Sequence, residues 1–298
     1  MCRATHHFFT RKARIKGMKR GLVLEGGAMR GLYTAGVIDV MMENGIDYDG
    51  MIGVSAGAAF GCNYKSRQPG RVIRYNTRFC CDKRYCSLET LVKTGNLYEA
   101  EYCYHIVPTQ YDVFDSKTFA ANPMEFYVTC TDVVTGEPVY HRVDQADYEG
   151  LEWVRASASM PLVARVVALG GQKLLDGGIA DSIPLKKFEQ LGYDRNVVVL
   201  TRPAGYVKQP NKLVPIVRMA MRKYPKFVEA LAARPAMYNA EVAYVRERER
   251  EGKAFVFSPD EALPIGYTCH DPALMWTVYE LGREQCKRRL AELRDFLG

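Results

Sequence analysis

The 298-residue sequence has no apolar run that approaches the roughly 20 residues of a membrane-spanning helix. Its start also lacks the apolar stretch of roughly 7–15 residues that a secretory signal contains. Internal repeats and low-complexity segments are missing as well. These absences argue against membrane-spanning, secreted and repeat proteins. We expect a cytoplasmic protein, with peripheral contact at a membrane surface as the alternative location.

Cysteine is present, with nine residues, but the paired Cys-x-x-Cys spacing of zinc sites is absent. An odd number at irregular spacing, without a secretory signal, favours reduced thiols over a disulfide framework. One local group leaves a metal site open as an alternative: Cys80, Cys81, Cys86, Cys103 and His105. We expect the protein to need neither a metal nor another cofactor.

An excess of one charge sign is missing from most of the chain. The first 20 residues hold seven Lys and Arg and no acid, whereas the rest of the chain holds 34 bases and 34 acids. A neutral body argues against an extended phosphate-binding surface, so nucleic acid is not an expected partner. Residues 1–17 are expected to form a basic, disordered tail. Contact of this tail with a membrane surface, or a true start at Met18, are the alternatives.

The sequence does contain short apolar runs that alternate with glycine turns and helical periodicity. Residues 21–24 and 51–54 are strand-length runs, and each is followed by a turn and a helical pattern. Two such units in series predict a parallel sheet covered by helices. Further strands are expected in two hairpins and two buried runs, at residues 125–143, 166–175, 196–201 and 254–257.

Residues 203–298 are predicted to be a mostly helical part of one α/β domain that spans residues 18–298. Within it, residues 211–251 have a helical pattern that Pro225 and Pro235 divide. Bases alternate there with apolar residues, which suits either a helix at a lipid surface or over a pocket, or a solvated helix packed on the body. A last long helix is expected to start at Asp271-Pro272.

Two glycine-rich turns could present catalytic groups. Ser55 lies in a G-x-S-x-G sequence between a predicted strand and helix, where a nucleophile elbow belongs. The segment Glu25–Gly31 also joins a strand to a helix, and its bare backbone can hold either a nucleotide phosphate or the oxyanion of acyl transfer. Dinucleotide binding needs an acid after the second strand, where the serine turn lies instead. The serine turn also has a plain structural interpretation, as a glycine-rich connection from strand to helix with a capping serine.

Two charged residues in or near such turns suggest a function. Asp176 is followed by two glycines, which is typical of a simple turn but could also present the carboxylate to Ser55. Arg30 lies at a predicted helix start, where a positive charge is unfavourable beside the positive end of the helix dipole. That conflict favours a functional role for Arg30 over a plain surface charge.

Taken together, the motifs resemble the patatin-like phospholipase family in type and order. The family pattern combines a G-G-x-x-R/K-G loop, a G-x-S-x-G elbow and a D-G-G/A segment, and residues 155–161 (RASASMP) resemble its A-S-x-x-x-P segment. The resemblance covers about residues 18–205. It implies a three-layer fold with a mostly parallel central sheet flanked by helices, and a lipid or acyl-ester substrate.

The resemblance also implies roles for individual residues. Ser55 would be the nucleophile and Asp176 its base, in a dyad without histidine. The oxyanion hole would be formed by Gly26, Gly27, Ala28 and Arg30, and the elbow by Gly53 and Gly57. Ala28 departs from the pattern, because the family usually has a third glycine there. Since alanine prefers negative φ, this departure puts the loop geometry and the room for substrate in question.

The implied reaction is hydrolysis through an acyl-enzyme, as in a lipid esterase of phospholipase A or lysophospholipase type. Three alternatives stay open. Ser55, Asp176 and His270 follow the chain order of an α/β-hydrolase triad. An acyltransferase would use the same acyl-enzyme with another acceptor. A nonenzymatic lipid-binding module would not need both Ser55 and Asp176. The sequence carries no signal for an oligomeric state.

Overall fold

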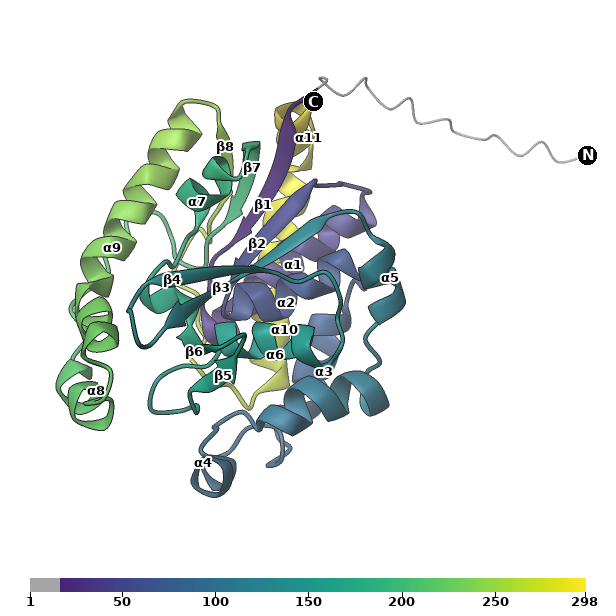
Figure 1. Ribbon diagram of the computed structural model, residues 1–298. Coiled ribbons are helices and arrows are strands. Elements are labelled where there is room, and N and C mark those ends of the chain that lie inside the picture. The colour runs from purple at the N-terminus through teal and green to yellow at the C-terminus, as the bar shows by residue number, and fades with distance from the viewer. Residues whose placement is uncertain (1–16) are drawn as a thin grey trace, which may run out of the picture.

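The computed structural model describes residues 17–298 (Figure 1). Its strands form one sheet with the order β5-β6-β3-β2-β1-β7-β8, and β4 pairs with β3. The strands are β1 (Lys19–Leu24), β2 (Gly50–Val54), β3 (Glu125–Asp132), β4 (Pro138–Arg142), β5 (Val167–Leu169), β6 (Gln172–Asp176), β7 (Tyr193–Val199) and β8 (Ala254–Phe257). The five strands from β3 to β8 in this order pair in parallel, whereas β4, β5 and β6 are antiparallel additions at one side.

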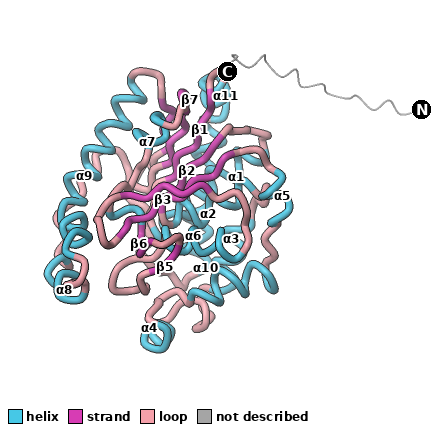
Figure 2. The backbone as a smooth tube through the Cα atoms, in the orientation of Figure 1, coloured by secondary structure: helices cyan, strands magenta, loops and turns pink. Residues whose placement is uncertain are grey.

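Helices cover both faces of the sheet, and Figure 2 shows the strands as one layer between them. Alternate residues of β1 enter opposite cores, because successive side chains of a strand point to opposite faces. Leu22 and Leu24 pack into the core beneath one helical layer, and Val23 packs into the other. One layer contains α1 (Gly31–Glu43), α2 (Ala56–Lys65), α6 (Tyr148–Ser157) and α10 (Pro272–Arg288); the other contains α7 (Leu185–Gln190) and α9 (Pro225–Arg250). The predicted three-layer α/β class is confirmed.

The remaining helical elements have ten residues or fewer. They are α3 (Arg71–Phe79), α4 (Leu88–Thr94), the π-helix η2 (Tyr102–Tyr111), α5 (Ser116–Ala121), α8 (Val214–Ala220), α11 (Leu290–Leu297) and the 3₁₀ turns η1 (Ala28–Arg30) and η3 (Gly177–Ile179). Within residues 17–298, no helix is long and apolar enough to cross a bilayer. The basic tail expected at residues 1–17 lies outside the described residues, apart from Gly17.

Two predicted helix boundaries in the C-terminal part are wrong. Pro225 begins α9, but the helix continues through Pro235 to Arg250. Buried residues on both sides of Pro235, including Leu231 and Tyr238, hold the helix against the body, and this packing outweighs the lost helical hydrogen bond.

The single long helix expected after Asp271 is in fact two helices. α10 ends at Arg288 and α11 begins at Leu290. Arg289 between them donates from Nη1 to the carbonyl of Val256 on β8, at 2.6 Å. The turn lets α11 bury Leu293 and Leu297, which a straight continuation would direct elsewhere.

Candidate active site

Ser55 lies in the sharp turn between β2 and α2. Its φ of 55° and ψ of −122° are rarely adopted by a residue with a side chain. The Ser55 N–H donates to Oγ of Ser157 at 2.9 Å, and Ser157 in turn donates to the carbonyl of Thr129 at 2.6 Å. A Cβ on Gly57 would lie 2.3 Å from the carbonyl oxygen of Leu24, so only glycine fits there. These contacts fix the turn and the direction of the serine hydroxyl.

Asp176 comes to Ser55 through the register of β3, the strand between β2 and β6. Thr129 of β3 pairs with Val54, directly before the serine, and its neighbour Cys130 pairs with Asp176. The sheet therefore brings together two residues that are 121 positions apart in the printed sequence.

Asp176 is buried, with 4% of its surface exposed to solvent. Its Oδ1 accepts the N–H of Gly178 at 2.8 Å. Burial raises the pKa of Asp176 above its ordinary value, and the positive charge of Arg234 and a hydrogen bond from Ser55 only partly oppose this rise. A carboxylate with a raised pKa is a stronger base for the serine hydroxyl than an exposed one.

The glycine loop after β1 lies directly against the serine. A Cβ on Gly26 would lie 2.9 Å from Cβ of Ser55, so the loop backbone can approach the hydroxyl only because Gly26 has no side chain. Among residues 17–298, no acceptor takes the N–H groups of Gly26, Gly27 or Ala28. Three unpaired donors at this place could stabilise negative charge that develops beside Ser55.

Glu25 fixes the position of this loop through two hydrogen bonds. The sequence motif did not indicate this role. One carboxylate oxygen accepts the N–H of Thr201 at 2.5 Å, and the other accepts the hydroxyl of Tyr238 at 2.8 Å. Burial raises the pKa of Glu25. The loop is therefore tied to Thr201, directly after β7, and to Tyr238 of α9, which follow Glu25 by 176 and 213 positions.

Ala28, the departure from the family pattern, has a φ of 48°. Glycine adopts this left-handed conformation without a steric penalty, whereas alanine loses roughly 1–2 kcal/mol. The loop thus keeps a glycine-type conformation at Ala28, so the substitution adds backbone strain and one methyl group beside the site.

Arg30 is the last residue of η1 and the N-cap of α1, and its side chain is buried rather than exposed to solvent. It is 8% exposed, and its Nε has no hydrogen-bond partner among the described residues. Its guanidinium carbon lies 5.5 Å from the ring centre of Tyr267. Burial, followed by the charge of Arg202, lowers the pKa of Arg30. The charge that conflicts with the helix dipole therefore borders a cavity next to Ser55.

Ser55 borders an apolar cavity of about 200 Å³. Its lining includes Phe60, Leu97, Val107, Phe114, Leu151, Val154 and Val163. Such a cavity excludes water from one side of the hydroxyl and has the character of a site for a hydrocarbon chain.

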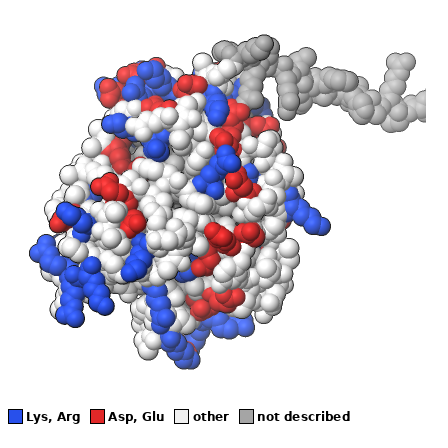
Figure 3. All heavy atoms as spheres, viewed as in Figure 1, with Lys and Arg blue, Asp and Glu red and all other residues white. Residues whose placement is uncertain are grey.

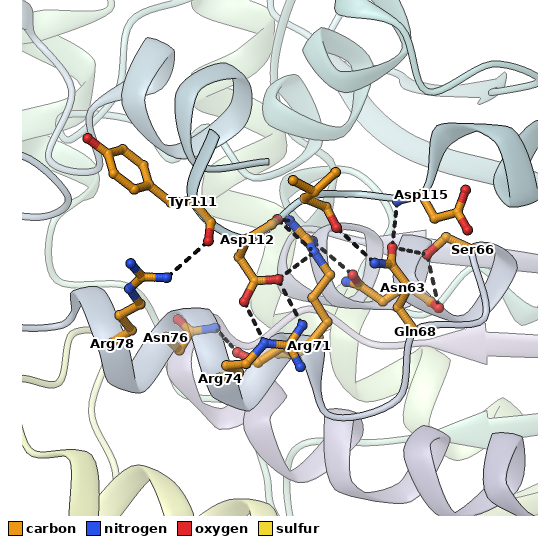
Figure 4. Close-up of polar contacts among 12 residues, drawn as sticks. Asn63, Ser66, Gln68, Arg71, Arg74, Asn76, Arg78, Tyr111, Asp112 and Asp115 are labelled. Carbon is orange, nitrogen blue, oxygen red and sulfur yellow. Dashed lines mark hydrogen bonds and ion pairs between the residues drawn. The ribbon is translucent and has the colours of Figure 1, made fainter. Parts of the chain in front are cut away.

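Arg71, which lines this cavity, belongs to a cluster of charged and polar side chains that Figure 4 shows. Nε of Arg71 lies 3.2 Å from Oδ1 of Asp112, and Nη1 donates to Asn63 at 2.9 Å. Arg74 also donates to the Asp112 carboxylate, at 2.6 Å. Asp112 neutralises only one of these two guanidinium charges, but Arg71, the member that lines the cavity, has both a carboxylate and an amide partner.

The histidine alternatives lie away from the serine. A ring nitrogen of His270 contacts the carbonyl of Cys80, and His270 borders neither cavity at Ser55. His105 bonds to Glu152 at 2.9 Å and stacks on Tyr148. The structure therefore brings Ser55, Asp176 and the glycine loop together and leaves His270 outside.

The cysteine group considered as a metal site is dispersed over separate contacts. The sulfurs of Cys80 and Cys81 lie 3.7 Å apart, whereas Cys103 contacts the carbonyl of Tyr85. Within the described part of the chain, no three His, Cys, Asp or Glu side chains are grouped to hold a metal ion.

Comparison with known families places this geometry in a class. A sequence model of the family described as "Patatin-like phospholipase" matches residues 22–188, more than half of the chain. The protein belongs to the patatin-like phospholipase family. A second model, described as a domain of unknown function (DUF6363), matches residues 224–298, which contain α9, β8, α10 and α11.

Individual relatives share the same region. YjjU of Escherichia coli K12, an uncharacterized protein, is 32% identical over 203 residues, which cover 63% of this chain and 54% of YjjU. Lysophospholipase nte1 of Aspergillus oryzae is 29% identical over 188 residues, 61% of this chain but 12% of that protein. Among solved structures, VipD of Legionella pneumophila has a TM-score of 0.45 and 12% identity, over 92% of this chain and 67% of VipD. The chain thus spans about half of YjjU and a small part of the fungal protein.

Proposed function

We propose that the protein is a serine acyl hydrolase of lipid esters, of phospholipase A or lysophospholipase type, with a Ser55–Asp176 dyad. The observation that carries the proposal is the meeting of three features at one hydroxyl. Ser55 hydrogen bonds to a buried carboxylate of raised pKa, faces unpaired loop N–H groups and borders an apolar cavity. Family membership and the name of the fungal lysophospholipase support a lipid substrate.

The proposed reaction has two steps. Asp176 takes the proton of Ser55 while Oγ attacks the ester carbonyl, and the loop N–H groups bind the oxyanion, each contributing roughly 2.7–4 kcal/mol as in comparable sites. The protonated Asp176 then gives its proton to the leaving alcohol. In the second step Asp176 takes a proton from water, whose oxygen attacks the acyl-enzyme. Asp176 then gives this proton to Oγ of Ser55 as the bond between Oγ and the acyl carbon breaks, so the fatty acid leaves and the Ser55 hydroxyl is restored.

The other functions receive less support from the geometry. The histidine triad needs an imidazole beside Ser55, but His270 contacts Cys80. A lipid-binding module has no need of a serine at positive φ joined to a buried carboxylate, because such strain is typical of catalytic sites. An acyltransferase remains the second candidate, since the apolar cavity and the dyad would serve it equally well.

Product analysis tests the proposal against that candidate. The protein is incubated with a lysophospholipid labelled in its acyl chain, with and without added glycerol, and the lipids are separated by chromatography. We expect free fatty acid as the main product in both cases, because water can reach the acyl-enzyme. Acylated glycerol or acylated lysolipid as the main product would identify an acyltransferase, and an unchanged substrate would contradict both.

We further propose that α8 contacts the surface of an anionic membrane. The sequence pattern of residues 211–251 allowed either an interfacial or a packed helix. The structure has two helices there, α8 and α9, and they differ in how far their apolar side chains are buried. α9 buries Phe227 and Leu231, whereas Leu213, Ile216 and Met219 at α8 are 51%, 50% and 74% exposed. Lysines and arginines gather over α8 at the lower left of Figure 3, and those in and around it are Lys212, Arg218, Arg222 and Lys223. Exposed apolar side chains ringed by bases suit the headgroup region of a bilayer.

Vesicle flotation tests this contact. We expect the protein to float with vesicles of anionic lipid and much less with vesicles of neutral lipid, because each base near an anionic surface contributes about 1 kcal/mol. Replacing Ile216 and Met219 by serine should weaken binding several-fold. The matched control is Val113→Ser, which removes a 63% exposed apolar side chain elsewhere. Equal flotation with both lipids, or equal loss in the control, would contradict an anionic contact through α8.

A further inference from the structure

A second cavity borders Ser55, and it is polar where the first is apolar. Its volume is about 30 Å³, and four basic side chains line it: Arg30, Arg202, Lys208 and Arg234. We call it the basic pocket. A water-sized group needs roughly 10–15 Å³ of such cavity volume, so the pocket has room for two or three groups of that size. That is the space taken by the terminal oxygens of one phosphate.

None of these four bases forms a salt bridge with a carboxylate within residues 17–298, and aromatic rings accompany three of them instead. The cationic groups of Arg30, Arg202 and Lys208 lie 5.5, 4.4 and 4.5 Å from the ring centres of Tyr267, Tyr206 and Tyr238. The Nε atoms of Arg30 and Arg234 are buried and have no hydrogen-bond partner among the described residues. Buried polar atoms normally have a partner, so two unpaired arginine Nε atoms in one pocket point to an absent anion.

The acidic side chains of the pocket do not neutralise the positive charge of its four bases. The acids among its lining residues are Glu25 and Asp176, and both carboxylates already accept hydrogen bonds. Glu25 accepts from Thr201 and Tyr238, and Asp176 accepts from Gly178. Burial, followed by the charge of Arg234, lowers the pKa of Lys208 to about 8. Four bases against two acids leave an excess of two positive charges, the charge of a phosphate monoester dianion with opposite sign.

The bases are held in place by the C-terminal part of the chain. The N–H of Lys208 donates to Oδ1 of Asn239 on α9 at 2.8 Å, and Nδ2 of Asn239 donates back to the carbonyl of Lys208 at 3.2 Å. Arg234 lies one turn before Asn239 on the same helix, close enough that a Cβ on Gly178 would be 3.0 Å from its Nη2. Arg202, Lys208 and Arg234 all follow the residues that the patatin-like family model matches.

We propose that the basic pocket binds the phosphate of the substrate head group and selects lipids with a phosphate monoester. This inference rests on the proposed lipid hydrolase function and specifies its substrate. Because Ser55 borders both cavities, one lipid can place its acyl chain in the apolar cavity, its ester at the hydroxyl and its phosphate in the basic pocket. A choline or ethanolamine head group would add a cation beside four bases and exceed the pocket's volume, so such lipids bind less well.

The test compares three lipids that carry the same oleoyl chain. They are 1-oleoyl lysophosphatidate, 1-oleoyl lysophosphatidylcholine and 1-oleoylglycerol, each presented in the same neutral detergent micelles to the full-length protein. We expect kcat/KM for the phosphate monoester to exceed both others by about tenfold to a hundredfold, the range for hydrogen bonds to a charged group. Equal rates for the three lipids would overturn the head-group assignment, while their hydrolysis would still uphold the proposed function.

Two variants connect this preference to the pocket. In Arg202→Met and Lys208→Met the ratio of kcat/KM for lysophosphatidate over 1-oleoylglycerol should fall about tenfold each. Arg234 is left intact, because its charge acts on Asp176 more strongly than the charge of Lys208 does. The control Lys117→Met removes the same charge from the exposed surface of α5 and should leave the ratio unchanged. An unchanged ratio in both pocket variants, or equal losses on both substrates, would overturn the proposal.

Inorganic phosphate separates a lipid head group from a free phosphate ligand. We expect it to compete with lysophosphatidate at millimolar concentration, and to compete less well in Lys208→Met. If micromolar phosphate instead altered the hydrolysis of 1-oleoylglycerol while the three lipids reacted equally, the pocket would belong to a free anion. That result would overturn the assignment to the substrate.

Discussion

Ser55→Ala should lower the rate of ester hydrolysis by at least about four orders of magnitude. The variant loses the only atom that attacks the carbonyl, and residual rates of roughly 10³–10⁴ over water in comparable enzymes come from the oxyanion hole and binding alone. The main-chain bond from residue 55 to Ser157 does not involve the hydroxyl, and alanine has the same difficulty with positive φ as serine. The fold should therefore be unaffected, with a melting temperature within a few degrees.

Fluorophosphonate labelling tests Ser55→Ala without depending on the choice of ester substrate. Wild-type protein should acquire one covalent adduct, which mass spectrometry of peptides should assign to Ser55, and Ser55→Ala should acquire none. Ser116→Ala is a suitable control, because that hydroxyl donates to the carbonyl of Ala146 at 3.0 Å and borders neither cavity at Ser55. Hydrolysis by folded Ser55→Ala at the wild-type rate would exclude this serine as the nucleophile.

Asp176→Asn should lower kcat by roughly three to four orders of magnitude, whereas His270→Ala should stay within a few-fold of wild type. The asparagine oxygen can still accept the N–H of Gly178, but the amide cannot take the proton of Ser55. Burial disfavours the charged form of Asp176, so removing this charge should leave the protein at least as stable at neutral pH. Lost activity without lost stability would therefore report on the base. A folded but inactive His270→Ala would instead establish a triad.

The pH profile follows from the same carboxylate. In the proposed mechanism activity needs the deprotonated form of Asp176, so it should fall as the pH drops through the pKa of Asp176. Since burial raises that pKa, the acidic limb should lie above the ordinary aspartate value of about 3.9. In Asp176→Asn this limb should be absent from the remaining activity. A limb that persists in Asp176→Asn and disappears in His270→Ala would assign it to the histidine, whose ordinary pKa is about 6.5.

The central part of the fold could be predicted because its signals are local. Parallel strands buried on both faces are continuous apolar runs, and residues 21–24, 51–54 and 196–199 all show this character. Residues 69–122 carry no such signal, and only helices with loops could be expected there. Their π-helix contains Pro108, and their aromatic core depends on contacts between several short elements rather than on a repeating period. Helix α9 passes through Pro235 for a similar reason, since tertiary packing decides there against local propensity.

The candidate site also contains residues that local motifs predict and residues that they do not. Ser55, Asp176 and the glycine loop could be proposed because each is part of a short motif at a strand end. Glu25 and Ser157, which hold the loop and the elbow in place, have no motif of their own, since their partners lie far along the chain. The bases of the basic pocket are scattered over residues 30–234 and meet only because α9 packs back on the sheet. No spacing in the sequence could have grouped them.

The two positive φ angles at Ala28 and Ser55 also bear on how the protein can evolve or be engineered. Strain of this kind is roughly 1–3 kcal/mol per residue, against a total stability of roughly 5–15 kcal/mol for a typical domain. Selection for heat tolerance alone would favour glycine at both positions, and glycine at position 55 would give a sturdier protein without a nucleophile. Thermostable descendants that keep activity should therefore carry their improvements in elements remote from Ser55, such as the surface of α11.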